Sequence, residues 1–386
     1  MLRFLTQSYP EKSKKALGEF LKESSPLTNE EIDTLLSNLS PKIIRDLFVL
    51  LKKANLVVIE EKNDTGDSTV RSEVGEKKEP ARYLLSEKTA GSGGVGAVYF
   101  AYDLKMKRLV AIKNNTDTFS LPHLEALEIE AKQQSATHNS NIITVYDLLK
   151  IPDFLSGNRI PYMVMECMDP ETSATLQDIL SGSSPDTDEI RNSTFELNHS
   201  QNTMSRVFTP EAALTIMYDI LEVVDLLYKN GKRLHLDWKP ENVFLTPEGT
   251  KVADFGLLAM SQHSNFQDNL FGSPRYMAPE RIRPNEPINL ATELYSLSLL
   301  LYTLICGSNH PYAEGHHPRA VLIAILTNKP DQHIERKGIV KAYAEKTGLN
   351  YEKLLNFFKI TLNPINEQRP QTVEEYQDLL ENAFSH

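Results

Sequence analysis

Two short segments gather the side chains that phosphate chemistry requires. The first, His235–Asn242, reads His-Leu-Asp-Trp-Lys-Pro-Glu-Asn, and the second, Asp254-Phe255-Gly256, begins twelve residues after the asparagine. Together they supply two aspartates, a lysine and an amide. Such groups offer oxygen ligands for Mg²⁺, a base for a hydroxyl, and a cation for the charge on a transferred phosphoryl group. Each segment alone is typical of an ordinary turn, but their order and spacing indicate phosphoryl transfer.

A glycine-rich segment, Gly91–Gly96, lies well upstream of these loops. Because glycine has no Cβ, a turn of this kind lets backbone N–H groups approach phosphate oxygens closely. The following residues, Ala97–Phe100, are predicted to continue as a strand, whereas a dinucleotide-binding turn leads into a helix. We therefore expect a phosphate-covering loop between two strands, with a glycine-rich hairpin that binds no ligand as the alternative.

An apolar strand, Val110–Lys113, ends in a lysine 17 residues after Gly96. A lysine at the end of a buried strand either extends to solvent or binds an anion. Its natural partners are the α- and β-phosphates of a nucleotide and a carboxylate from a neighbouring helix. The amphipathic stretch that follows offers Glu130 as the expected ion-pair partner, with Glu128 as the alternative.

The elements that must position these residues change in type along the chain. From Tyr83, short β-branched runs predict a strand-rich region, and from about Thr209 longer periodic patterns predict helices. The longest apolar run, Leu294–Cys306, is too short to span a bilayer and predicts a buried helix. Residues 181–208 are rich in Ser, Asn, Asp and Thr, which indicates a surface insertion, with a disordered segment as the alternative.

Residues 1–80 are predicted to form a separate, mainly helical module that ends in a polar linker. A capping-box pattern at Thr28 and Glu31 supports one of its helices, and the strand and hairpin pattern that follows resembles a winged helix. In residues 1–60, nine Lys and Arg stand against eight Asp and Glu, so the basic face that DNA binding needs is missing. We expect an interaction or regulatory role, with a structural brace as the alternative.

The composition excludes several classes of protein. Of the 386 residues, 40% are hydrophobic and 24% are charged, and the net charge of −11 gives no field that would attract nucleic acid. Two cysteines without CxxC spacing exclude a disulfide framework and a zinc knuckle, and they indicate a reducing compartment. We find no export signal and no apolar run long enough to cross a membrane, so we expect a cytoplasmic protein without a membrane span.

In this order, the segments resemble those of the eukaryotic-type (Hanks-type) Ser/Thr protein kinase family, from about Tyr83 to the end of the chain. Two further segments carry the resemblance: Met163–Met168 is similar to the family's hinge, and Gly272–Glu280 is similar to its substrate-binding loop. Arg369 resembles the arginine that pairs with the glutamate at the end of that loop. The Lys-Pro-Glu-Asn form of the first catalytic segment, together with Ser273, resembles Ser/Thr kinases rather than tyrosine kinases.

The resemblance implies an α+β, bilobal protein kinase fold with a β-rich N-lobe, a helical C-lobe and an N-terminal helical extension. The expected domains are the module at residues 1–80 and a kinase domain at 81–386. Within the kinase domain, the N-lobe and hinge would occupy 81–168 and the C-lobe 169–386, with an insertion at about 181–208.

The resemblance also implies a reaction, in which ATP with Mg²⁺, or Mn²⁺ in its place, phosphorylates hydroxyls of a protein substrate. Asp237 would orient the hydroxyl and accept its proton, Lys239 would neutralise the γ-phosphoryl group, and Lys113 would hold the α- and β-phosphates. The expected catalytic residues are Lys113, Glu130, Asp237 and Lys239, the metal ligands Asn242 and Asp254, the ATP-binding residues Gly91, Gly93, Gly94, Gly96, Val98, Ala111, Lys113, Met165, Glu166, Met168 and Phe244, and the substrate-loop residues Ser273 and Glu280.

Five positions depart from the family's pattern. Leu236 replaces the arginine that binds an activation-loop phosphate, so we expect activity that does not depend on such phosphorylation. Glu293 stands where an aspartate braces the catalytic loop, Ser298 replaces a glycine, and Trp238 replaces a leucine. Gln134 occupies an apolar position in a buried stack, which leaves room for a partner that orders the active state.

Two other functions remain open on the residues alone. A pseudokinase-like nucleotide-binding scaffold, or a partner-activated regulator, would keep the pocket but not the turnover. Phosphorylation of a small molecule or a lipid is a third interpretation, against which the loop Gly272–Glu280 argues. A regulatory protein is expected to bind through residues 1–80, and if the protein is a bacterial effector it would act in the cytosol of a host after translocation.

Overall fold

The computed structural model describes residues 82–92, 96–115, 121–152, 159–200, 203–257, 272–283, 286–307, 311, 318–327, 334–335 and 337–385. The helical module predicted for residues 1–80 lies outside the described residues, as do Gly93 and Gly94 of the glycine-rich segment. The chain divides into two compact units. The described part of the first contains 82–131 and 144–167, and that of the second contains 132–143 and 168–385.

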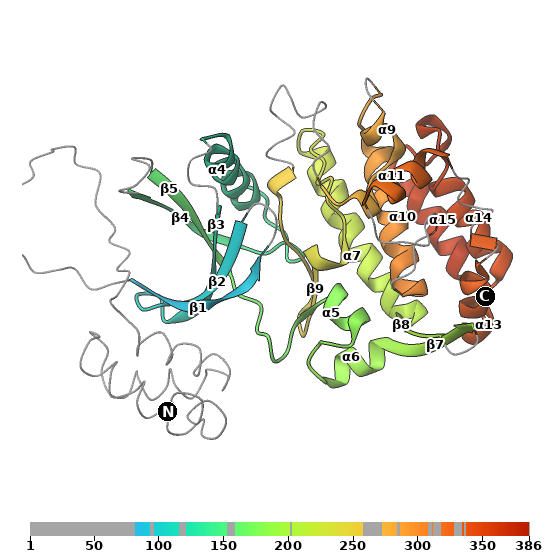
Figure 1. Ribbon diagram of the computed structural model, residues 1–386, viewed down its shortest axis with the longest axis horizontal. Coiled ribbons are helices and arrows are strands. Elements are labelled where there is room, and N and C mark those ends of the chain that lie inside the picture. Colours follow the sequence, from blue (N-terminus) through green and yellow to red (C-terminus); the bar gives the residue numbers. More distant parts are fainter. Residues whose placement is uncertain are drawn as a thin grey trace, which may run out of the picture. The chain divides into compact units, whose positions relative to one another are not determined.

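The first unit is built on one antiparallel sheet with the strand order β1-β2-β3-β5-β4, and helix α4 packs against it (Figure 1). The division between the two units falls inside α4, after Ala131. The elements are β1 (Tyr83–Ser92), β2 (Gly96–Asp103), β3 (Arg108–Asn115), α4 (Leu121–Ser135), β4 (Val145–Pro152) and β5 (Arg159–Glu166).

Alternation along β3 decides which side chain reaches α4. Val110 and Ile112 are fully buried on one face of the sheet, in a cluster that includes Val164 of β5. On the other face, Leu127 of α4 packs in a cluster with Met163 of β5. Because successive side chains of a strand point to opposite faces, Lys113 is directed away from the Val110 cluster and towards α4.

The second unit is mainly helical. Its helices are α5 (Leu176–Ser181), α6 (Asp188–Ser193), α7 (Pro210–Lys229), α9 (Pro279–Ile282), α10 (Leu290–Cys306), α11 (Pro318–Thr327), α13 (Ile339–Thr347), α14 (Tyr351–Thr361) and α15 (Val373–Phe384), and its single turns are η2 (Pro240–Asn242), η3 (Pro274–Tyr276) and η4 (Asn366–Gln368). Short strands form two small sheets, β6 (Ala174–Thr175) with β9 (Val243–Thr246) and β10 (Gly249–Val252), and β7 (Thr194–Ser200) with β8 (Thr203–Phe208). The predicted α+β fold, a strand-rich unit followed by a helical one, is confirmed.

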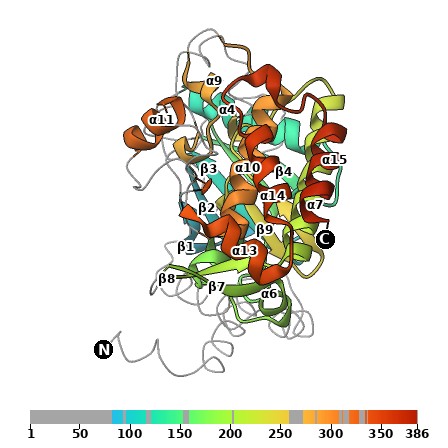
Figure 2. The same cartoon turned by 90° about the vertical axis from the view of Figure 1, so that its right-hand side faces the viewer.

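Helix α10 forms the centre of the helical unit. Every one of its 17 residues is buried, which confirms the buried helix predicted over Leu294–Cys306. A reciprocal capping box between Asn289 and Thr292 starts it. Helices α7, α13 and α14 pack against it (Figure 2). Helix α7 begins at Pro210, a residue suited to the first turn, and Thr209 caps it by accepting the Ala212 N–H.

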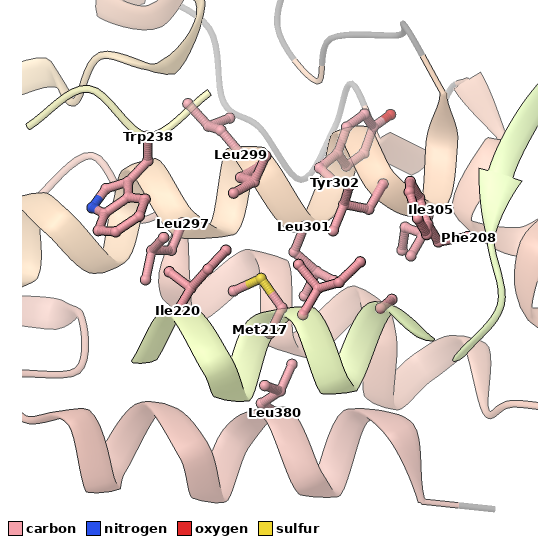
Figure 3. Close-up of a cluster of buried hydrophobic side chains, with 14 of the residues drawn as sticks. Phe208, Met217, Ile220, Trp238, Leu297, Leu299, Leu301, Tyr302, Ile305 and Leu380 are labelled. Atoms are coloured by element: carbon pink, nitrogen blue, oxygen red, sulfur yellow. The ribbon is translucent and has the colours of Figure 1, made fainter. Parts of the chain in front are cut away.

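The side chains of this core come from distant parts of the chain (Figure 3). Met217 and Ile220 of α7 face Leu297 of α10, and Leu380 of α15 approaches from below in the view. Trp238, the single tryptophan of the chain, is fully buried in the same cluster. The loop that carries the predicted catalytic residues is therefore anchored in the largest core of the helical unit.

The segment taken as a surface insertion, 181–208, forms α6 and the β7–β8 hairpin in its described residues. Leu197 and Phe208 are buried, and Tyr343 of α13 donates a hydrogen bond to the Phe208 carbonyl over 2.9 Å. In β7 the buried Leu197 lies between the exposed Glu196 and Asn198, whereas β8 ends in two consecutive buried residues, Val207 and Phe208. The described part of the segment is neither disordered nor confined to the surface.

No helix among the residues described here is long and apolar enough to cross a membrane.

Candidate active site

The β9–β10 hairpin brings the two predicted metal ligands together. Asn242 directly precedes β9 and Asp254 follows shortly after β10, and the register pairs Val243 with Val252. The Ala253 N–H donates to the Asn242 carbonyl over 2.9 Å. Because antiparallel pairing places the start of one strand beside the end of the next, Asn242 and Asp254 lie at the same end of this small sheet.

Asp237 lies at the centre of the second unit's polar cluster. Its Oδ1 accepts the backbone N–H of Ser273 over 3.1 Å. Its Oδ2 accepts from Nζ of Lys239 over 2.7 Å and from the amide nitrogen of Asn242 over 3.1 Å. The structure thus brings together four of the predicted site residues. Both carboxylate oxygens accept hydrogen bonds, which gives the buried Asp237 side chain one orientation.

Lys239 keeps its positive charge in this cluster. Burial by itself would lower the pKa of Lys239, but the charge of Asp237 and its hydrogen bond outweigh that effect and raise the pKa above its usual value. A cation next to Asp237 would suit the charge that develops on a transferred phosphoryl group.

The donor set near Asp237 fits a magnesium ion that is shared with phosphate. The amide nitrogen of Asn242 is engaged by the carbonyl and the carboxylate of Asp237, so its oxygen is the atom that can face a cation. Asp254 adds a carboxylate, one oxygen of which accepts the Gly256 N–H over 3.3 Å. Among the described residues, no three His, Cys, Asp or Glu side chains gather into a metal cage. Mg²⁺ commonly binds in this way, with few protein oxygens completed by phosphate and water.

The first unit holds its own pair of charged residues. Nζ of Lys113 on β3 lies 2.6 Å from Oε1 of Glu130 on α4, and both side chains are largely buried. Glu128, the alternative partner, instead binds Lys150 of β4 over 2.7 Å near the surface. The two glutamates therefore have distinct partners, and the buried pair is the one with Lys113.

The other residues expected around ATP follow the strand register. Val98 of β2 lies opposite Lys113 and also opposite Gly91 of β1. Ala111 of β3 lies opposite Met165 of β5. The hinge-like segment crosses the division between the units, which falls between Cys167 and Met168, while Phe244 lies on β9.

At the end of the predicted substrate loop, Glu280 forms a bidentate ion pair with Arg369. The distances are 2.7 Å and 2.9 Å, and both side chains are almost completely buried. Burial alone would raise the pKa of Glu280, but the hydrogen bonds and charge of Arg369 outweigh it and hold the pKa below its usual value. The pair ties the loop to the segment before α15.

Two contacts of the catalytic loop were not foreseen from the sequence. Arg281 of α9 donates to the Leu236 carbonyl over 3.2 Å. The indole N–H of Trp238 donates to Oε2 of Glu293 on α10. Arg281 directly follows Glu280 of the predicted substrate loop, and this position is the one feature of the sequence that could have indicated the contact of Arg281.

Gln134, expected to place a polar group in an apolar stack, has a hydrogen bond of its own. Its amide nitrogen donates to the Ile143 carbonyl over 2.6 Å, and its Oε1 is buried without a partner among the described residues. The ring of His235 stacks on Trp238, with centroids 4.3 Å apart, and meets the edge of Phe255. Burial lowers the pKa of His235, so this ring is neutral near pH 7.

Comparison with known proteins gives a consistent result. The family model for the protein kinase domain matches residues 84–384. Over 256 residues, 64% of this chain, the sequence is 30% identical to a probable serine/threonine-protein kinase, SCO3848, of Streptomyces coelicolor. Over 255 residues it is 28% identical to serine/threonine-protein kinase PknB of Mycobacterium leprae. The matched stretches cover 33% and 36% of those proteins, so the chain spans about a third of the length of these relatives.

Proposed function

Because the chain belongs to the protein kinase family, as its motifs predicted, we propose that it transfers the γ-phosphoryl group of ATP to serine and threonine hydroxyls of proteins. The observation that supports this most strongly is the set of hydrogen bonds around Asp237. They hold a carboxylate, a lysine and an amide in the arrangement that the reaction needs. The Ser/Thr preference is supported by the Lys-Pro-Glu-Asn sequence and by the names of the relatives.

In this proposal each side chain has one task. Asp237 orients the acceptor hydroxyl and takes its proton, and Lys239 faces the charge that develops on the phosphoryl oxygens. Asn242 and Asp254 would hold Mg²⁺, or Mn²⁺ in its place, which would supply positive charge beside the phosphates. Catalysis by this site is mainly positioning and electrostatics.

Nucleotide binding is assigned to the first unit and the hinge-like segment. Lys113, held by Glu130, contacts the α- and β-phosphates. The residues proposed to surround ATP are Gly91, Gly93, Gly94, Gly96, Val98, Ala111, Lys113, Met165, Glu166, Met168 and Phe244. Ser273 and Glu280 belong to the proposed substrate loop, and the start of the family match at residue 84 supports a kinase domain at 81–386.

The Lys113–Glu130 pair allows a matched test. Replacing Glu130 with glutamine is expected to lower kcat/KM for ATP by about tenfold or more, because Lys113 loses the charge that positions it. Glu128→Gln is the control, since both glutamates lie on α4 and each binds a lysine. It should change kcat/KM by less than about twofold. Equal losses in the two variants would remove Lys113 and Glu130 from the proposed site.

We propose that activity is independent of phosphorylation in the activation segment. Leu236 cannot bind a phosphate, whereas the Arg281 side chain and the Ser273 N–H contact the catalytic loop directly. The activation segment, residues 257–271, contains two serines, Ser261 and Ser264. The double variant Ser261→Ala, Ser264→Ala is therefore expected to keep peptide phosphorylation within about twofold of wild type. Phosphatase-treated wild type should do the same. A large loss in both preparations would show that a phosphate is required.

The direct test of function is Mg²⁺-dependent transfer of labelled phosphate from ATP to serine and threonine peptides. Binding of ATP without transfer would favour the scaffold, and transfer to a lipid or small acceptor alone would favour the third interpretation. We propose that the substrate is a protein. We also propose that the chain acts in the cytoplasm, because its two cysteines without CxxC spacing are typical of a reducing compartment. Residues 1–80 are proposed as the site of a regulatory partner, which a truncation starting near Pro80 would test by a change in activity.

A further inference from the structure

The peptide groups of Leu236 are held from two different helices. Leu236 has a φ of +65°, a left-handed conformation that a branched side chain disfavours, so its backbone needs support from outside the loop. Its N–H donates to Oε1 of Glu293 on α10 over 2.7 Å, and its carbonyl accepts from Arg281 on α9. The adjacent residue is Asp237, so these two contacts set the position of the proposed base.

Glu293 can support Leu236 only if its second oxygen also has a donor. The side chain lies in the fully buried helix α10, where an unsatisfied carboxylate oxygen is costly. The indole N–H of Trp238 supplies that donor to Oε2. A leucine at this position would fill space but could not donate a hydrogen bond.

We propose that Trp238 is a positioning residue for Asp237: its indole N–H holds the Glu293 carboxylate, which in turn holds the backbone on the N-terminal side of the base. The proposal rests on the proposed function for its kinetic consequence. Trp238 and Glu293 therefore act together: the glutamate, which replaces the shorter aspartate usual in the family, holds the loop only while the indole N–H binds its second oxygen.

The protonation state of Glu293 gives this unit a pH dependence. Burial raises the pKa of Glu293 to about 7, against the opposing effect of the hydrogen bonds from Trp238 and from the backbone of Leu236 and His235. The charged groups that act on it are Arg281 of α9 and, through Arg281, Asp237 of the loop. The ionised form accepts these hydrogen bonds, so the contact with the Leu236 backbone weakens as the pH falls through this pKa. Loss of the indole N–H raises the pKa further.

The kinetic test compares Trp238→Phe with Tyr376→Phe in the full chain. Tyr376 is also buried, and its hydroxyl lies 3.1 Å from Oγ of Ser298 on α10, the helix that carries Glu293. Each substitution therefore keeps an aromatic ring and removes one polar contact to α10. At pH 7, Trp238→Phe is expected to lower kcat about tenfold with little change in KM for ATP. In the profile of kcat against pH, the acidic limb of Trp238→Phe should lie about one pH unit above that of the wild type. Most of the loss in kcat should therefore be recovered at pH 9. Tyr376→Phe should leave kcat and the profile unchanged.

Intrinsic fluorescence tests the contact without any need for activity. Trp238 is the single tryptophan, so its emission reports on this site alone. A transition centred close to pH 7 is expected in the wild type and should be absent in Glu293→Gln. The His235 transition, which lies below 6.5, should persist in that variant. No transition near pH 7 in the wild type would overturn the proposal, even if the variants failed to fold.

A second pair of residues tests the coupling. Trp238→Leu and Glu293→Asp restore the residue types usual in the family, and each alone is expected to lower kcat. Together they should recover more activity than the product of the two single losses predicts, because the shorter acid no longer needs the indole donor. Independent losses that simply multiply, or a Trp238→Phe profile identical to that of Tyr376→Phe, would show that Trp238 only packs.

Discussion

Replacing Asp237 with asparagine is expected to lower kcat for peptide phosphorylation by about a thousandfold, because the amide cannot accept the hydroxyl proton. The substitution also removes the negative charge that holds Lys239. Binding of ATP should be largely retained, since the proposed metal ligands and Lys113 are unchanged. The expected signature is thus a large fall in kcat with a small change in the dissociation constant for ATP.

The control for this variant is Asp225→Asn. Asp225 also binds a lysine, Lys229 over 2.6 Å, but on the exposed surface of α7. The same chemical change there should leave kcat within about twofold and cost little stability. Melting curves of both variants separate a loss of catalysis from a loss of fold. A kcat near the wild-type value in folded Asp237→Asn would exclude Asp237 as the base.

The second large effect is expected on stability. Replacing Arg369 with alanine should lower the free energy of unfolding by about 3–5 kcal/mol, because Glu280 is left as an uncompensated charge in the interior. Arg369 binds both oxygens of Glu280, donates to the Asn363 carbonyl and lies over the ring of Tyr295. Arg369→Lys should lose a large share of the stabilisation that Arg369 provides, since lysine cannot bind both carboxylate oxygens of Glu280 in parallel. Urea denaturation measures the loss.

The pH dependence of this stability has a definite sign. The pKa of Glu280 is lowered in the folded chain, so the stabilisation is complete above the ordinary value of 4.5 and is lost as the pH falls through the lowered pKa. The difference in the free energy of unfolding between wild type and Arg369→Ala should therefore become smaller in acid. Lys359→Ala, which breaks an exposed ion pair with Glu335, is the control and should cost less than about 1 kcal/mol. A similarly small cost for Arg369→Ala would contradict the account.

The residues proposed to carry the chemistry could be grouped from the sequence because they occur in short segments with fixed spacing. Asp237, Lys239 and Asn242 share one loop, so their proximity follows from the chain itself. The strand that ends in Lys113 and the buried helix at Leu294–Cys306 were also readable, since each is a continuous apolar run. Sequence alone left two partners open for Lys113, because residues 128 and 130 are both acidic.

What could not be predicted depends on contacts between distant parts of the chain. Glu293 and Trp238 are 55 residues apart, and only packing decides which donor satisfies a buried carboxylate. Arg281 reaches the Leu236 carbonyl for the same reason. In the segment 181–208 the polar composition concealed the few apolar residues, among them Leu197 and Phe208, that the fold buries. Residue type alone also gave no sign that Gln134 would find the Ile143 carbonyl.

Kinase activity is measured by transfer of phosphate from γ-labelled ATP, with Mg²⁺, by the full chain to a mixed set of serine, threonine and tyrosine peptides. We expect label on phosphoserine and phosphothreonine that vanishes in Asp237→Asn and remains in Asp225→Asn. Bound ATP without transfer by the wild type, or label that persists in folded Asp237→Asn, would contradict the proposed function.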